Sequence, residues 1–432
     1  MTIPSQPFAL HGAEKMIYDV RMGPLAVARG DSLYVAYHAN PDGPENHPHV
    51  LKRDGATGRW SEPVRIGTVP RFDHHFAPVI WFDHEGRLHA LHGCHGRPGT
   101  HVMAGKPDFI EGWTDAAQIA PSISYPHVLP MAGGRLLLYY RAFGHLGYWC
   151  YRTSDNGGMS WSPARTLVDF DRDPEDPLDC WTGSYHSVVR GRDGRSLHIA
   201  FIYLDELKHL NPLYNRRFTS RSTLNRYHLY YLKLDLESGG LSTIDGRPME
   251  PIVNRARAEA CKVWNGGWRL TNMPSIHVDD RDQPSFLLPI SGKSPWECEF
   301  TFVRRAGDRW ERIPVAPTNS TWCGGLLRGG ADGVLRAYVT AGKEYGELLD
   351  YGGGDLEEWT SSNGGTAWTY AQTIAPEPGL FYNNPRFVES DNGEYLDDSL
   401  LFFGWQGPGS LKAAASRRAP GRGKAFLWHR SE

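Results

Sequence analysis

Short runs of alternating apolar and polar residues recur along the whole chain, each preceded by a turn that contains glycine or aspartate. Clear examples are RGDSLYVAY at 29–37, EGRLHAL at 85–91 and GGRLLLY at 133–139. The pattern returns at 193–200, 280–287, 332–338 and 392–403. Alternation with a period of two is typical of β-strands, and no long stretch has apolar residues at helical spacing. These copies predict an all-β protein.

A second element lies between the copies: a glycine turn followed by tryptophan. Two examples are nearly identical, SDNGGMSW at 154–161 and SSNGGTAW at 361–368. They resemble the Asp-box of sialidase-like propellers, with asparagine where the box usually has aspartate. Asn-Gly-Gly favours a turn with positive φ, and the tryptophan can fill the space between neighbouring sheets. Units of roughly fifty residues with several strands are typical of propeller blades, so seven copies predict a seven-bladed β-propeller.

We expect residues 1–432 to form this single domain. The interval between 205 and 278 is too long for one blade, which predicts an inserted loop around 205–227. A basic cluster lies in and beside this loop, and we interpret it as solvated, with an anion-binding rim as the alternative. Its members are Arg216, Arg217, Arg221 and Arg226.

Charge and cysteine content narrow the possible partners. A net charge of -3 does not indicate the basic surface that binding to nucleic acid or to an anionic membrane requires. The six cysteines have no CxxC spacing and read as buried thiols, although a zinc site using Cys94 with His92 or His95 is an alternative. The sequence indicates no membrane span and no signal peptide, so we expect a cytoplasmic monomer, or a secreted or periplasmic one if a leader was removed.

Candidate chemistry concentrates in residues 72–96, which contain six of the nineteen histidines. His75 precedes one predicted strand and His95 follows its hairpin partner, so antiparallel pairing should bring both to one end of the sheet. Tyr125 and Arg141 flank the next hairpin in the same way. We therefore expect these four side chains to face one pocket.

These residue types suit β-elimination from a 4-linked uronic acid. Arginine can bind and neutralise the carboxylate, which makes the C5 proton acidic. Histidine or tyrosine can remove that proton and protonate the departing O4, provided that nearby positive charge lowers the tyrosine pKa. A sialidase would need an arginine triad and a tyrosine paired with glutamate, and we find no such set.

The His75/His95 spacing, followed by Ser-Tyr-Pro at 124–126 and Tyr-Arg at 140–141, resembles the BNR-type seven-bladed propeller polysaccharide lyases. This family includes ulvan lyases and lyases that cleave L-rhamnose-α-1,4-D-glucuronate linkages. The resemblance implies that His75, Tyr125 and Arg141 are catalytic, with His95 second to them, and that the substrate is an anionic uronate glycan. This chain departs from the family pattern at Phe76, where asparagine is usual, and at Ala142–His145.

Further polar and aromatic residues are candidates for binding this substrate. They are His74, His145, Tyr185, His186, Asn272, Trp322 and Asn384. We expect no cofactor for the chemistry, with structural calcium or zinc possible.

Two other functions stay open from the sequence. One is an α-L-rhamnosidase acting on rhamnose-glucuronate, for which His38 is the candidate catalytic residue. The other is a carbohydrate-binding propeller without activity. If Tyr125 is not the base, His38 and His186 are the next candidates.

Overall fold

A computed structural model describes residues 7–12, 18–40, 46–71, 73–144, 147–170, 182–205, 226–293, 297–342, 352–374, 376–406 and 423–430. These residues form strands and turns, which confirms the all-β prediction. Helical structure among them is short, as in η1 (His74–Phe76), η2 (Ala132–Gly134), α2 (Arg255–Ala258) and η6 (Glu259–Cys261). No helix in this part of the chain has the length and apolar character that crossing a membrane requires.

Four sheets each contain four antiparallel strands that are consecutive in the chain. The first contains β6 (Val79–Phe82), β7 (Leu88–His92), β8 (Thr100–Met103) and β9 (Thr114–Asp115). The second contains β10 (Ser124–Pro130), β11 (Leu136–Arg141), β12 (Trp149–Ser154) and β13 (Arg165–Val168). The third contains β20 (Ser275–Val278), β21 (Pro284–Ser291), β22 (Cys298–Ala306) and β23 (Arg309–Thr318). The fourth contains β24 (Gly325–Gly329), β25 (Leu335–Ala341), β26 (Asp355–Ser361) and β27 (Thr369–Ile374).

Two sheets are larger. One has the order β14 (Thr182–Arg190), β15 (Ser196–Asp205), β16 (Arg226–Asp235), β17 (Leu241–Ser242) and β18 (Pro248–Met249), with β19 (Lys262–Trp264) also pairing with β16. The other has the order β1 (Pro7–Gly12), β30 (Gly423–His429), β29 (Tyr395–Gln406), β28 (Leu380–Ser390), β2 (Ala26–Arg29), β3 (Ser32–Ala39), β4 (His47–Arg53) and β5 (Val64–Arg65). A parallel pairing of β2 with β28 joins its two antiparallel halves.

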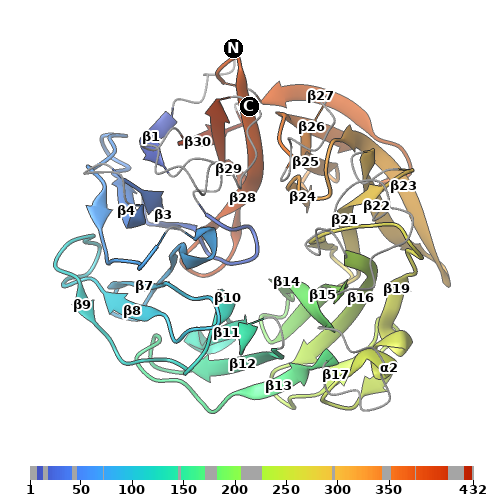
Figure 1. The fold of residues 1–432 in the computed structure, drawn as a ribbon, viewed down its shortest axis with the longest axis horizontal. Coiled ribbons are helices and arrows are strands. Elements are labelled where there is room, and N and C mark those ends of the chain that lie inside the picture. Colours follow the sequence, from blue (N-terminus) through green and yellow to red (C-terminus); the bar gives the residue numbers. More distant parts are fainter. Residues whose placement is uncertain are drawn as a thin grey trace.

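The sheets are arranged as a ring around a central axis, with strands such as β10, β14 and β24 near the centre (Figure 1). The first strand of the chain, β1, pairs antiparallel with the last strand, β30. The two ends of the chain therefore close the ring in one sheet.

Apolar side chains fill the space between neighbouring sheets. Val27 and Tyr34 of one sheet pack against Ile80 and Phe82 of the next, and all four are buried. Strand β11 is buried along its entire length because both of its faces meet other sheets. This explains why β11 reads as a continuous apolar run, LLLYY, in place of an alternating one.

Both Asp-box-like turns have the predicted conformation. The Ser154 hydroxyl donates to Asn156 Oδ1 at 2.9 Å, and the Ser361 hydroxyl donates to Asn363 Oδ1 at 2.8 Å. The glycine pairs of both turns have positive φ, for example 95° at Gly158, where a Cβ would lie 2.7 Å from Trp81. These positions require glycine for backbone conformation and for close packing.

The insertion expected around 205–227 falls almost entirely outside the described residues. What the structure describes are its two ends: β15 ends at Asp205 and β16 begins at Arg226, and the two strands pair with each other.

Candidate active site

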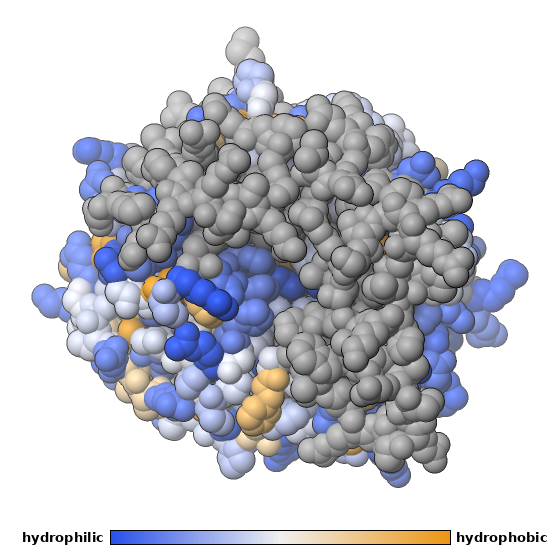
Figure 2. Space-filling model, viewed as in Figure 1, coloured by the Kyte–Doolittle hydropathy of each residue, from blue (hydrophilic) through white to orange (hydrophobic). Residues whose placement is uncertain are grey.

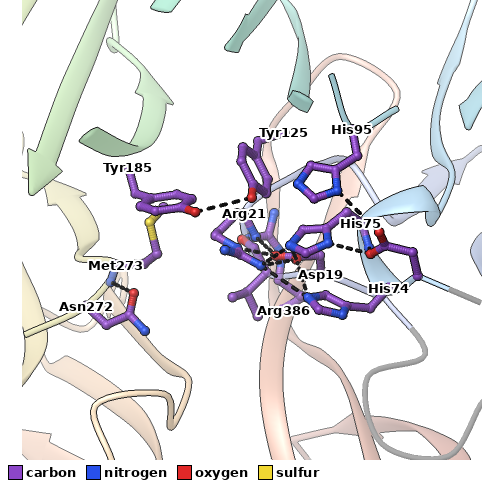
Figure 3. Close-up of polar contacts among 12 residues, drawn as sticks. Asp19, Arg21, His74, His75, His95, Tyr125, Tyr185, Asn272, Met273 and Arg386 are labelled. Atoms are coloured by element: carbon purple, nitrogen blue, oxygen red, sulfur yellow. Dashed lines mark hydrogen bonds and ion pairs between the residues drawn. The ribbon is translucent and has the colours of Figure 1, made fainter. Parts of the chain in front are cut away.

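The first hairpin brings its flanking histidines to one end of the sheet. Strands β6 and β7 pair with Val79 opposite Leu91, as predicted. Before β6, the chain forms η1, whose cap is Asp73: the Asp73 carboxylate accepts from the His75 backbone N–H at 3.1 Å. This turn directs both His74 and His75 toward the cluster shown in Figure 3.

The second hairpin does the same for Tyr125 and Arg141. Ser124 pairs with Arg141, and the register shifts before His127. Within this irregularity Tyr125 has a φ of 53°, a left-handed conformation that is uncommon for a bulky residue. Such strain costs on the order of 1–3 kcal/mol and is typical of functional sites.

Asp73 connects the two histidines. Its carboxylate oxygens lie 2.5 Å from His75 Nδ1 and 3.2 Å from His95 Nδ1. A carboxylate can only accept hydrogen bonds, so both imidazoles carry their proton on Nδ1 and have the lone pair on Nε2. The two rings stack with their centroids 3.9 Å apart.

An ion pair that sequence reasoning missed lies next to these histidines. Arg21 donates to Asp19 through Nε at 2.8 Å and Nη2 at 2.5 Å, and both side chains are buried. Arg21 Nη2 also lies 2.9 Å from His75 Nε2 and 3.3 Å from His74 Nε2. Asp19 and Arg21 lie before the first repeat copy, so no periodic pattern marked them.

Tyr125 lies at the centre of the cluster. The Arg21 and Arg141 guanidinium carbons are 4.7 Å and 4.8 Å from the centroid of its ring. The His75 ring centroid is 5.4 Å away, and the Tyr125 hydroxyl is 3.4 Å from that of Tyr185. The structure thus brings together His75, His95, Tyr125 and Arg141, as their spacing predicted.

The electrostatics of the cluster correct one expectation. Burial raises the pKa of Tyr125 well above 10, although Arg21 and Arg141 oppose this shift. The expected net lowering of its pKa is therefore wrong, because desolvation of the phenolate outweighs the nearby positive charges. Burial, together with His74 and His95, holds the pKa of His75 well below 6.5. At neutral pH the site therefore contains a protonated phenol beside an uncharged imidazole.

Arg141 is fully buried, and all three of its guanidinium nitrogens have no hydrogen-bond partner among the described residues. Its contacts are the faces of Tyr125 and Tyr185, the latter with its centroid 4.9 Å from the guanidinium carbon. A buried cation without a counter-ion is costly, so this geometry indicates a site that an anion completes.

The other predicted residues are distributed unevenly. His74 and Tyr185 belong to the cluster, whereas Asn272, Trp322 and Asn384 line a neighbouring cavity. His186 is buried in the core, stacked on Trp149 and hydrogen-bonded at 2.7 Å to both Tyr139 and Ser184, so its position does not support substrate contact. His145 lies outside the described residues.

His38, the candidate of the rhamnosidase hypothesis, is fully buried in β3. Burial, with a further contribution from His92, lowers its pKa to about 3. This position gives His38 no exposed surface from which to contact a sugar.

Arg226 corrects the interpretation of the basic cluster as a solvated loop. This side chain is buried at the start of β16, with its guanidinium carbon 4.5 Å from the Tyr185 ring centroid and 4.3 Å from that of Trp322. The other three arginines of that cluster lie outside the described residues.

A cavity of about 110 Å³ begins beside the cluster and follows the inner strands. Asp19 and Arg21 line it at the cluster, and Arg386 and Glu389 of β28 line it further along. Hydrophilic residues lie within the hollow near the middle of the face shown in Figure 2. The lining combines charged side chains with apolar ones such as Val188, Ile276 and Phe387.

Two groups of side chains could hold a metal ion. They are Asp19 with His74 and His75, and Asp73 with His75 and His95; within each group the ligand atoms lie within 4.8 Å of one another. Among the described residues, Cys94 belongs to neither group, and its buried thiol donates to the His92 carbonyl instead. The geometry therefore does not support the zinc site considered for Cys94.

The repeat architecture agrees with the comparison to known proteins. The chain belongs to the BNR repeat-containing family, whose model matches residues 32–317. This confirms the family resemblance that the sequence indicated.

Two relatives are ulvan lyases. One, from Pseudoalteromonas sp. (strain PLSV), is an ulvan lyase of family PL25, 25% identical over 317 residues, which make up 66% of this chain and 62% of that protein. The other, from Alteromonas sp. (strain LOR), is 24% identical over 399 residues, which make up 85% of this chain and 77% of that protein. The matched part thus spans about three fifths of the first relative.

Solved structures show a similar fold. A PL25 ulvan lyase matches with a TM-score of 0.78 at 18% identity, covering 99% of this chain and 96% of that one. A second structure of such an enzyme, bound to -[GlcA(1-4)Rha3S]-, matches equally well. At 18% identity, this similarity shows that the folds are alike and nothing more.

Proposed function

We propose that this protein is a polysaccharide lyase that cleaves a 4-linked uronic acid, glucuronate or iduronate next to rhamnose, by β-elimination. The observation that carries this proposal is Arg141, a buried guanidinium whose nitrogens have no hydrogen-bond partner among the described residues, positioned over the ring of Tyr125 beside a histidine pair. The relatives named as ulvan lyases support the same reaction class.

We further propose that the ring is a seven-bladed β-propeller. The eight-stranded sheet consists of two antiparallel halves joined by the parallel β2–β28 pairing, so each half counts as one blade. With the five other sheets, this gives seven units around the axis. Closure by β1 and β30 in one blade fits a propeller, because it removes the open edges that a sheet otherwise exposes.

In this mechanism Arg141 binds the uronate carboxylate through its planar fork and stabilises the negative charge that develops as C5 loses its proton. The Asp73-linked pair, His75 and His95, accepts the C5 proton, because both imidazoles have their lone pair on Nε2. The C5–H electron pair forms the C4–C5 double bond while the C4–O4 bond breaks. Tyr125 donates its phenolic proton to the departing O4.

The pKa directions suit this division of roles. An acid must start protonated and a base unprotonated, and the two members of such a pair are recognised by environments that separate their pKa values. Burial raises the pKa of Tyr125 and lowers that of His75, so each group rests in the form that its role needs. Arg21 Nη2 lies 2.9 Å from His75 Nε2 in this structure. Separate variants of His75 and His95 should therefore show which of the two accepts the C5 proton.

The test is incubation with a panel of uronate polysaccharides, followed by the ultraviolet absorbance of the unsaturated product. A hydrolase such as a rhamnosidase forms no double bond and gives no such signal. Tyr125→Phe should lower kcat by at least about 100-fold while binding persists, because it removes only the proton donor.

The matched control for this variant is Tyr139→Phe. Tyr139 is also a buried tyrosine, and its hydroxyl is hydrogen-bonded to His186 at 2.7 Å, outside the cluster. This control should retain activity. Equal rates for Tyr125→Phe and the wild type at saturating substrate would refute the role of Tyr125.

A further inference from the structure

Residues 18–24 precede β2 and connect two distant parts of the ring. At one end of this segment, the Tyr18 hydroxyl donates to the Asn384 carbonyl of β28 at 2.8 Å. At the other end, the Gly23 N–H donates to the Pro126 carbonyl of β10 at 3.0 Å. The position of the segment therefore depends both on β10 and on a strand near the C-terminal end of the chain.

The middle of this segment supplies two side chains to the candidate active site. Arg21 is paired with Asp19, and its Nη2 lies 2.9 Å from His75 Nε2. The Asp19 carboxylate lies 3.3 Å from His74 Nε2. Reacting groups must be held to within about 0.5 Å of their productive geometry by the residues around them. The orientation of the His75 ring thus depends on where the backbone of the segment lies.

Arg386 of β28 contacts the backbone of the segment between these two side chains. Its Nη1 donates to the Val20 carbonyl at 2.8 Å, and Figure 3 shows Arg386 next to Asp19 and Arg21. A Cβ at Gly23 would lie 2.6 Å from Arg386 Nη2, so the absence of a side chain at this position leaves room for the guanidinium. Arg386 forms no ion pair with a described residue, which leaves the Val20 carbonyl as its specific partner there.

The next residue of the segment has a separate support. The His127 imidazole is hydrogen-bonded to the backbone of Arg21, and it lines the same cavity as Arg386. Val20 and Arg21 are thus each held by their backbone, one from β28 and the other from β10. Removing one support should displace the Asp19–Arg21 pair while the other contacts keep the segment in place.

We propose that Arg386 is a positioning residue of the active site, which acts through the Val20 carbonyl to hold the Asp19–Arg21 pair in contact with His75. A guanidinium suits this role because a charge-assisted hydrogen bond is stronger than a neutral one and the planar group restricts its direction. The inference rests on the proposed function, since the orientation of His75 affects turnover only if the imidazole takes part in the elimination.

The first test separates kcat from KM in Arg386→Met, with turnover followed by the absorbance of the unsaturated product. A displaced catalytic group slows the chemical step more than it weakens binding, so kcat should fall about 10- to 100-fold while KM stays within about threefold. Arg386→Lys should recover part of kcat, because it retains the charge without the planar fork. It also gives the same comparison with the wild type if the methionine variant does not fold.

The matched control is Arg328→Met. Arg328 of β24 also donates to backbone carbonyls of a distant segment, those of Tyr395 at 2.9 Å and Leu396 at 2.8 Å, but it contacts no residue of the cluster. This variant should lose stability and keep the kcat of the wild type. If Arg386→Met also keeps that kcat, or if both variants lose kcat equally, the positioning role is overturned.

Crystal structures of the wild type and of Arg386→Met provide a test that needs no turnover. Arg21 Nη2 should move out of hydrogen-bonding distance of His75 Nε2 in the variant, while β28 keeps its pairing with β2. An unchanged contact between Arg21 and His75 would overturn the inference. A wild type that cleaves no uronate polymer contradicts the lyase proposal, whereas the position of Arg21 in the variant still supports or overturns the role of Arg386.

Discussion

Replacement of Arg141 by methionine should abolish activity without lowering the stability of the fold. Arg141 is fully buried, and none of its guanidinium nitrogens has a hydrogen-bond partner among the described residues. Its removal therefore leaves no buried partner unsatisfied. Replacing a buried charge with an apolar side chain of similar volume is often neutral or stabilising by about 1–4 kcal/mol.

The loss of two contacts with tyrosine rings acts in the opposite direction. Each cation–π contact contributes about 0.5–2 kcal/mol, so the loss of two contacts, about 1–4 kcal/mol, is of the same size as the gain, and the free energy of unfolding should change little. For activity, a charge-assisted contact with the uronate carboxylate contributes up to about 3 kcal/mol, which corresponds to a loss of roughly 100-fold or more in kcat/KM. Activity should thus be lost while stability stays close to that of the wild type.

Scanning calorimetry and the absorbance of the unsaturated product measure the two quantities. Arg152→Met is the reference variant, because Arg152 donates to the Tyr140 hydroxyl at 3.1 Å and to the Ser162 carbonyl at 2.8 Å on the neighbouring strand. It should lose stability and retain activity. An Arg141→Met protein that melts several degrees lower and still cleaves its substrate would show that Arg141 is structural.

Three further predictions concern the histidines. Asp73→Asn should reduce kcat/KM by about 10- to 1000-fold, because the carboxylate fixes the orientation of both imidazoles. The acidic limb of the pH profile should also move to lower pH, because Asp73 raises the pKa of His75 against the larger effect of burial. An unchanged pH profile would contradict this role. Stability should fall as the pH drops from 6.5 toward 4. Burial lowers the pKa of His92 to about 4, so in this range only the unfolded chain gains the proton, which costs the folded state up to about 3 kcal/mol. In His92→Leu the melting temperature should depend less on pH, and the same slope as in the wild type would refute the contribution of His92. Dialysis against a chelator should leave activity intact, whereas added zinc should inhibit by binding Asp73, His75 and His95; activity that chelation abolishes and zinc restores would overturn a metal-free mechanism.

The strands were predictable because their signal is local. Alternation within a few residues and the glycine turns of the two Asp-box-like segments specify strand, turn and repeat without knowledge of distant contacts. The same holds for His75, His95, Tyr125 and Arg141, because each pair flanks one hairpin and antiparallel pairing converts that spacing into proximity. His186 shows the limit of such reasoning, since a histidine within a strand can face either the site or the core, and here it packs on Trp149.

Residues whose role depends on contacts between distant segments were not predictable. Asp19 and Arg21 precede the first repeat, and only closure of the ring brings them beside His74 and His75. The pKa of Tyr125 depends on how completely neighbouring sheets exclude water, which no spacing reveals.

Arg226 is the clearest example of a residue whose environment depends on distant segments. In the sequence it ends a basic stretch and resembles the arginines before it, a cluster that the sequence analysis interprets as solvated. In the structure it begins β16, where pairing with β15 positions it between Tyr185 and Trp322, residues more than forty and ninety positions away. A sequence pattern cannot distinguish a solvated cation from a buried one when the surrounding walls come from other sheets. The burial of Arg226 becomes visible only after those walls are in place, because Tyr185 and Trp322 are what exclude water from its guanidinium.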